Sequence, residues 1–255
     1  MNPIFIFGCG VLGLILGSFV NAAVYRLRYR KPGLFFGRSK CIRCGHTLHA
    51  RDLIPLLSYL LLHGRCRYCD KGIGSHYAWT ELLFALTFIV VALFTPFGEI
   101  GLLTWNLLFA GILLFLASYD MQFGEIPDEI SLPAAALALI GIALPFTLSL
   151  GTGLIGLFVG GGFFAGLVLI SNGKWMGGGD IRMGLLLGAL VGWKGFLIAL
   201  FFASVVGSVV GLTQVIRKKR KLRSPLPFGP FLALGGIIAI LFTNQVWEWY
   251  VGSFL

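Results

Sequence analysis

Charged side chains are scarce in this sequence, and their scarcity restricts the class of protein. Only 12% of the 255 residues are charged, against about 25% in soluble globular domains. Hydrophobic residues make up 57% of the chain, and the mean hydropathy is +0.90. A soluble domain of this length could not hide so much apolar surface from water, so we predict an integral membrane protein embedded in the lipid bilayer.

Acidic residues are fewer still, with ten Asp and Glu against 20 Lys and Arg. Such an excess of positive charge indicates either nucleic-acid binding or the positive-inside rule of membrane topology. The apolar stretches predict eight membrane spans, at residues 4–24, 79–95, 101–119, 130–148, 151–171, 183–193, 195–216 and 228–250. Strict alternation then places the connecting segments 25–78, 120–129, 172–182 and 217–227 on one side of the membrane.

The distribution of the basic residues decides between the two interpretations. Nineteen of the 20 lysines and arginines fall on that one side, and only Lys194 falls on the other. This asymmetry marks the basic side as cytoplasmic, and we expect no nucleic-acid partner. The predicted fold is an all-α polytopic membrane protein. It has a first helix over 1–24, a cytoplasmic loop over 25–78 and a membrane domain over 79–255.

A basic segment ahead of the first apolar run is also missing, which excludes a cleaved signal peptide at that position. The basic residues instead follow the run, as Arg26, Arg28, Arg30 and Lys31. This order predicts a retained span with its N-terminus outside.

Four of the five cysteines form two CxxC pairs, Cys41/Cys44 and Cys66/Cys69, within the cytoplasmic loop. Two such pairs can offer four thiolates to one tetrahedral zinc ion. The reducing cytoplasm disfavours structural disulfides, although unrelated thiols or a redox pair remain the alternative. A site closed by four sulfurs has no open position for substrate, so we predict structural zinc.

Carboxylates are rare near the membrane spans, and two of them lie at cytoplasmic ends. Asp120 follows the apolar run 112–119, and Asp180 follows Gly177-Gly178-Gly179. An acid at this depth predicts a functional site, the alternative being a helix end that reaches headgroup water. Two neighbouring carboxylates cannot both ionise easily, so they can activate water as an acid and a base. The glycines would permit unusual backbone angles and close approach of another segment.

Several motifs, in this order, resemble the bacterial type IV prepilin peptidases, which are intramembrane aspartic proteases of the GxGD class. They are Gly17-Ser18-Phe19-Val20-Asn21, Tyr25-Arg26-Leu27, both cysteine pairs, Ile54-Pro55 with Ser58, Gly64-Arg65-Cys66, Tyr77, Glu81, Ile126-Pro127-Asp128 and Gly177-Gly178-Gly179-Asp180. Arg182 stands where the family commonly has lysine.

The resemblance implies that Asp120 and Asp180 are catalytic, supported by Gly177, Gly179, Pro127 and Asp128. The resemblance also implies a location in the bacterial plasma (inner) membrane. The substrates would be prepilins or pseudopilins, whose basic leader precedes an apolar helix. Family members commonly also methylate the new N-terminus with S-adenosylmethionine, an activity that the resemblance associates with the loop and with Gly64 and Glu81. The sequence shows no nucleotide-binding fingerprint that would support this second activity independently.

Three other functions stay open at this point. The chain could be a peptidase without methyltransferase activity, a proton- or cation-coupled transporter that uses the two aspartates as a relay, or a non-enzymatic assembly protein. A transporter would be expected to show paired repeats with broken helices, and the sequence shows none.

Three acids gather close to Asp120 on a side that is otherwise basic, namely Glu125, Asp128 and Glu129. We expect Glu125 and Glu129 to attract the basic leader of the substrate. The alternative is that the acids are solvated, or that they pair with nearby Arg or Lys.

Overall fold

The computed structural model describes residues 3–29, 37–217 and 226–254. These residues form helices and connecting loops, and among them β pairing is limited to two isolated bridges. The predicted all-α class is confirmed. The chain divides into two compact units, Met1–Glu99 and Ile100–Leu255, so that the residues predicted to form the second span belong with the first helix.

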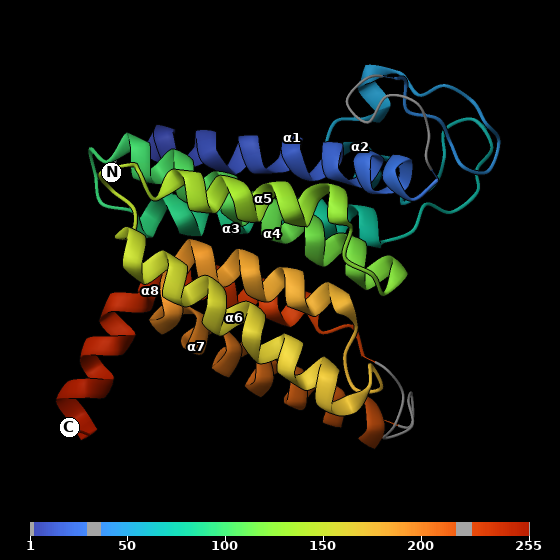
Figure 1. The fold of residues 1–255 in the computed structure, drawn as a ribbon. Helices are drawn as coiled ribbons and strands as arrows, with labels where there is room; N and C mark the ends of the chain where they lie inside the picture. The colour runs from blue at the N-terminus through green and yellow to red at the C-terminus, as the bar shows by residue number, and fades with distance from the viewer. Residues whose placement is uncertain (1–2, 30–36, 218–225, 255) are drawn as a thin grey trace. The chain divides into compact units, whose positions relative to one another are not determined.

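The first unit consists of two long helices and the loop that joins them (Figure 1). Helix α1 (Pro3–Arg28) packs against α3 (His76–Phe94). Their backbones approach closely, because a Cβ atom at Gly17 would lie 2.7 Å from the Cα of Glu81. The intervening loop carries the short elements η1 (Ala50–Asp52) and α2 (Leu57–Leu61).

The second unit is a bundle of α4 (Ile100–Phe123), α5 (Asp128–Gly141), α6 (Leu150–Ser171), α7 (Gly178–Ile216) and α8 (Gly229–Phe254). Helix α7 contacts α5, α6 and α8, while α4 contacts α5 and α8. Small residues at helix interfaces allow such close packing in membranes. Here a Cβ atom at Gly160 would overlap the carbonyl oxygen of Gly184 on α7.

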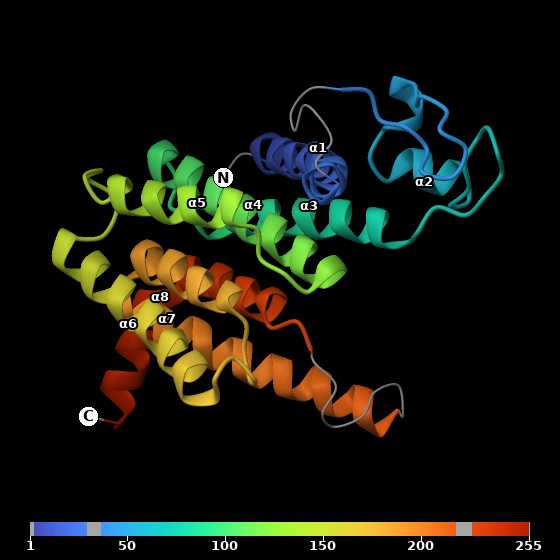
Figure 2. The same cartoon turned by 45° about the vertical axis from the view of Figure 1, so that its right-hand side comes forward.

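Helix α7 is interrupted at Gly192, whose φ of 69° and ψ of 178° are not helical. The two halves of α7, coloured light and darker orange, run in roughly opposite directions (Figure 2). This reversal corresponds to the boundary between the predicted spans 183–193 and 195–216. Glycine fits the position because its φ lies in the left-handed region and a Cβ atom would meet the Thr152 side chain at 2.7 Å.

Six of the described helices, α1, α3, α4, α6, α7 and α8, are long and apolar enough to cross a membrane. Helix α5, within the predicted span 130–148, has 14 residues, fewer than the roughly 20 of a typical membrane-spanning helix. The eight predicted spans therefore correspond to α1, α3, α4, the shorter α5, α6, the two halves of α7, and α8.

Candidate functional site

Asp120 lies in the last turn of α4 with only 5% of its surface exposed. Its Oδ2 atom accepts a hydrogen bond of 2.9 Å from the backbone N–H of Gly229, the first residue of α8. Backbone N–H groups in the first turn of a helix lack partners within the helix. The start of α8 therefore offers a fixed donor to the buried carboxylate.

Asp180 lies in the first turn of α7 and is partly exposed. Its backbone N–H donates to the carbonyl oxygen of Gly177 at 3.2 Å. The carboxylates of Asp180 and Asp120 are close enough to interact electrostatically. The fold thus brings together two acids from distant parts of the sequence, one buried and the other partly exposed.

The glycines before Asp180 differ in their surroundings. Gly177 precedes α7 with φ −86° and ψ 163°, and none of Gly177, Gly178 and Gly179 has a positive φ. The expected unusual backbone angles are therefore not found. Close approach is found at Gly179, where a Cβ atom would lie 3.0 Å from Cβ of Ile126. A Cβ atom at Gly177 would have only the backbone nitrogen of Gly179 nearby, at 4.0 Å.

The segment Ile126-Pro127-Asp128 packs beside this glycine tract. Pro127 precedes α5, and its carbonyl oxygen accepts hydrogen bonds from the N–H and Oγ of Ser131. Asp128 forms an ion pair of 2.5 Å with Arg182, which also donates to the carbonyl oxygen of Ile126 at 3.5 Å. Asp128 is thus paired, and the segment is tied to the first turn of α7 beside Asp180.

The other two acids of the predicted cluster, Glu125 and Glu129, are exposed. Glu125 belongs to the connection between α4 and α5, and Glu129 to the first turn of α5. Both lie at the same end of these helices as Asp120.

In the first unit, the four cysteines of the two CxxC pairs converge. The sulfur atoms of Cys41, Cys44, Cys66 and Cys69 all lie within 4.8 Å of one another. Four sulfurs bound to one zinc at about 2.3 Å would be separated by about 3.8 Å. The four side chains are therefore placed to hold one metal ion.

Each pair sits in a hairpin with the same backbone hydrogen bonds. In the first hairpin, Cys41 N–H donates to the carbonyl of His46, and Gly45 N–H donates to the carbonyl of Cys41. In the second, Cys66 N–H donates to the carbonyl of Lys71, and Asp70 N–H donates to that of Cys66. The two cysteine pairs therefore lie in hairpins of the same type.

Asp52 joins the second hairpin to the segment that directly follows the first. Its carboxylate accepts hydrogen bonds from Arg67 Nε at 2.7 Å and Tyr68 Oη at 2.8 Å, both in the second hairpin, and from His49 N–H at 3.1 Å. Burial of the carboxylate acts to raise the pKa of Asp52, but the hydrogen bonds from Arg67, Tyr68 and His49 outweigh burial and lower it to about 2. Asp52 is therefore ionised at neutral pH.

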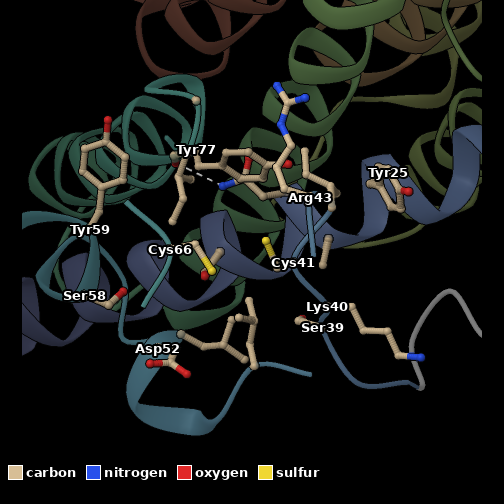
Figure 3. A pocket seen from close by; sticks show the side chains of 18 of the residues that line it. Tyr25, Ser39, Lys40, Cys41, Arg43, Asp52, Ser58, Tyr59, Cys66 and Tyr77 are labelled. Atoms are coloured by element: carbon tan, nitrogen blue, oxygen red, sulfur yellow. Dashed lines mark hydrogen bonds between the residues drawn. The ribbon is translucent and has the colours of Figure 1, made fainter. Parts of the chain in front are cut away.

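Between the cysteine hairpins and the facing ends of α1 and α3 lies a cavity of about 750 Å³ (Figure 3). Glu81 lines it and accepts a hydrogen bond of 2.7 Å from Leu56 N–H. Gly64 has φ of 69°, and a Cβ atom there would press on the hydroxyl of Tyr59, another lining residue, at 2.9 Å. Both residues that the resemblance associates with methylation thus lie at or next to this cavity.

Sequence reasoning assigned no role to Gly229 or Asp52, and it named Asn21 only as part of the first family motif. A glycine between Phe228 and Pro230 at the start of an apolar span was a visible signal for a helix start. No local pattern indicated that Asp52 would join the second hairpin to the segment after the first or that Asn21 would line the cavity.

Comparisons with known proteins agree with these features. Residues 11–95 match the Bacterial Peptidase A24 N-terminal domain, and residues 107–212 match the Type IV leader peptidase family. No solved structure matches the chain.

Three curated relatives carry the name prepilin leader peptidase/N-methyltransferase. The protein of Aeromonas salmonicida is 32% identical over 96% of this chain and 93% of its own length. That of Burkholderia pseudomallei is 35% identical over 91% and 84%, and that of Pseudomonas aeruginosa is 31% identical over 94% and 91%. The resemblance predicted from the motifs is confirmed, and the chain belongs to the type IV leader peptidase family.

Proposed function

We propose that the chain is an aspartic endopeptidase that removes the leader peptide from prepilins or pseudopilins. The observation that carries this proposal is the pair formed by Asp120 and Asp180, which interact electrostatically at the ends of two membrane helices. Membership of the family and the names of its relatives supply the substrate class.

In the proposed reaction the two carboxylates share one proton. The ionised carboxylate takes a proton from water, whose oxygen attacks the carbonyl carbon of the scissile peptide bond. The protonated carboxyl donates a hydrogen bond to the carbonyl oxygen and stabilises its developing charge. The C–N bond then breaks, and the leaving amine takes up a proton from the pair, which returns to its starting state.

The surrounding residues would hold this pair in place. Gly229 N–H fixes one oxygen of Asp120, while the Asp128–Arg182 ion pair and the contact of Gly179 with Ile126 fix the segment beside Asp180. Glu125 and Glu129, exposed at the same end, would attract the basic leader. Fixing the two aspartates in advance lowers the free-energy cost of reaching the reactive geometry.

The chain would cut at the cytoplasmic face of the bacterial inner membrane. The support is the distribution of basic residues, since 19 of 20 lie in segments assigned to one side by the predicted topology. Asp120, Asp180 and the cysteine hairpins all belong to that side. The basic leader of a prepilin would lie there too, ahead of its membrane helix.

We further propose that the chain methylates the new N-terminal amine with S-adenosylmethionine, as the names of its relatives imply. Zinc would be held by Cys41, Cys44, Cys66 and Cys69 and would be structural, because four thiolates leave no open coordination position. S-adenosylmethionine, when bound, supplies an electrophilic methyl group on a sulfonium. The neutral amine of the substrate would take that methyl group as the bond between methyl carbon and sulfur breaks, which leaves S-adenosylhomocysteine. The methylated amine would then lose a proton to solvent.

The peptidase is tested with Asp120→Asn and Asp180→Asn in membranes that contain a leader-bearing prepilin. Each variant should insert normally and lose nearly all cleavage, because an amide cannot exchange the proton, and acid–base catalysis contributes roughly 10²–10⁴-fold per group. Methylation of a synthetic prepilin that already lacks its leader should persist in both variants. Substantial cleavage by either variant would refute the proposed pair.

A further inference from the structure

We propose that the cavity in the first unit is the binding site for S-adenosylmethionine, an inference that rests on the methyltransferase activity proposed above. The cavity is enclosed by the C-terminal half of α1, the start of α3 and both cysteine hairpins. Its volume of about 750 Å³ lies within the roughly 300–1,000 Å³ typical of small-ligand and cofactor sites.

Asn21 provides the clearest sign that this cavity receives a ligand. It is only 7% exposed and lines the cavity. Its Nδ2 donates to the carbonyl oxygen of Tyr77 at 3.0 Å, but its buried Oδ1 has no hydrogen-bond partner within the described chain. A buried acceptor without a donor costs free energy, so a ligand that brings an N–H or O–H group would be stabilised here. S-adenosylmethionine carries such groups on adenine, ribose and the amino acid.

The lining offers partners for the remaining parts of the molecule. Lys40 and Arg43 are cationic groups for a carboxylate, and neither forms an ion pair with any residue that the structure describes. In Figure 3 the Arg43 side chain points away from Cys41 and Cys66. Tyr25, Tyr59 and Tyr77 offer aromatic rings for adenine or for the sulfonium, which attracts ring faces as other cations do.

Two acids line the cavity, Asp52 and Glu81, and the carboxylate of Asp52 is already bound by protein groups. The Asp52 carboxylate is 4% exposed and is occupied by Arg67, Tyr68 and His49. Glu81 lines the wall with one oxygen bonded to Leu56 N–H, and a carboxylate there can accept from ribose hydroxyls. The site therefore presents cations, aromatic rings, an acid and an unmatched acceptor around one volume.

Cys41 and Cys66 form part of the cavity wall (Figure 3), and their sulfur atoms lie within 4.8 Å of each other. The first hairpin supplies Lys40 and Arg43, and the second supplies Arg67 and Lys71. Metal bound to the four cysteines would hold both hairpins at the spacing that the ligand needs. The metal would thus support methylation by positioning the two hairpins, although the metal itself would contact no reactant.

The test measures binding of radiolabelled S-adenosylhomocysteine, the demethylated product, to the full zinc-loaded chain in nanodiscs of neutral lipid. The wild type should bind one equivalent. Arg43→Gln and Asn21→Leu should each raise Kd about tenfold or more, since each loses a hydrogen bond to a polar or charged group. The matched control is Arg65→Gln, which also precedes a cluster cysteine but lies outside the cavity and pairs with Asp70 on the surface. Its Kd should not change.

Photo-crosslinking of wild-type protein with an azido-adenosyl analogue gives a second readout that needs no variant. Label should map to peptides that contain Tyr25, Tyr59 or Tyr77. Label confined to residues 100–255, or a Kd unaffected by Arg43→Gln and Asn21→Leu while the wild type still methylates substrate, would overturn the cavity assignment and leave the methyltransferase in place. Wild-type protein that neither binds the product nor transfers methyl would overturn both. Displacement of the label by phosphatidylglycerol but not by phosphatidylcholine would instead identify the cavity as a lipid-headgroup site.

Discussion

The backbone N–H of Gly229 donates a 2.9 Å hydrogen bond to Oδ2 of Asp120. The same glycine leaves no room for a side chain, since a Cβ atom would lie 2.6 Å from that oxygen. One residue at the start of α8 therefore supplies the donor and limits where the carboxylate can lie.

Gly229→Ala should lower kcat for prepilin cleavage at least tenfold and change KM little, because the added methyl group displaces the carboxylate that reacts but does not touch the leader. The measurement is steady-state cleavage of a purified prepilin. Gly211→Ala is the control, because the nearest atom to its new Cβ would be 3.8 Å away. Equal kcat values for the two variants would contradict a positioning role for Gly229.

The Asp128–Arg182 ion pair should act on Asp180 through the segment that it holds. Arg182→Lys, which keeps the charge, should cleave nearly as well as the wild type. Arg182→Gln and Asp128→Asn should each lower kcat several-fold, and the double variant should be no worse than either single one, because both remove the same contact. The free energy of unfolding should change by less than about 1 kcal/mol in each variant, as expected for a partly exposed ion pair. Additive losses in the double variant would show that the two residues act separately.

Purified chain should contain one zinc per molecule. Cys41→Ser or Cys69→Ser should remove it and speed hydrogen exchange across residues 39–73, because metal binding supplies folding free energy to such loops. Methylation should fall far more than leader cleavage. Metal analysis of protein kept reduced and free of chelators provides the check, and a metal-free chain with normal methylation would rule out the structural ion.

Asp52 should stabilise the cysteine hairpins over the whole physiological pH range. Its pKa in the folded chain, about 2, lies below the ordinary 3.8. Stability from a carboxylate with a lowered pKa is fully present above about pH 4 and is lost as the pH falls through about 2. Hydrogen exchange of residues 49–68, corrected for the intrinsic pH effect, should therefore be equal at pH 8 and pH 6 in the wild type.

Asp52→Asn should raise that exchange at both pH values, because Arg67 loses its charged partner. Asp70→Asn is the control, since the Arg65–Asp70 pair is 61% and 80% exposed and surface pairs contribute little. Similar exchange in the two variants would mean that Asp52 does not join these segments.

Neutralising the exposed acids with Glu125→Gln and Glu129→Gln together should raise KM for a basic leader and spare kcat. Contacts made equally to substrate and transition state change apparent affinity more than turnover. The defect should shrink at high salt, because the Debye length is about 8 Å at physiological ionic strength, and for a leader whose lysines are replaced. Unchanged KM for basic and neutral leaders would show that the two acids take no part in leader recognition.

The amino-acid sequence by itself determined the membrane class, most helix positions and the four cysteines that converge. Long apolar runs exclude a soluble fold whatever their partners are, and the paired CxxC spacing defines each hairpin within a few residues. Asp120 and Asp180 stood out because an acid beside a membrane span is costly wherever the helix packs.

Only the tertiary structure decided which groups meet. Gly229 reaches Asp120 from another helix, Asp52 contacts the second hairpin, and Asn21 faces a cavity built from four separate segments. The ion pair between Asp128 and Arg182 likewise joins two segments that are distant in the sequence. Hydrophobic periodicity fixes which residues form a helix, but contacts between distant segments depend on how the helices pack, and no local pattern encodes that packing.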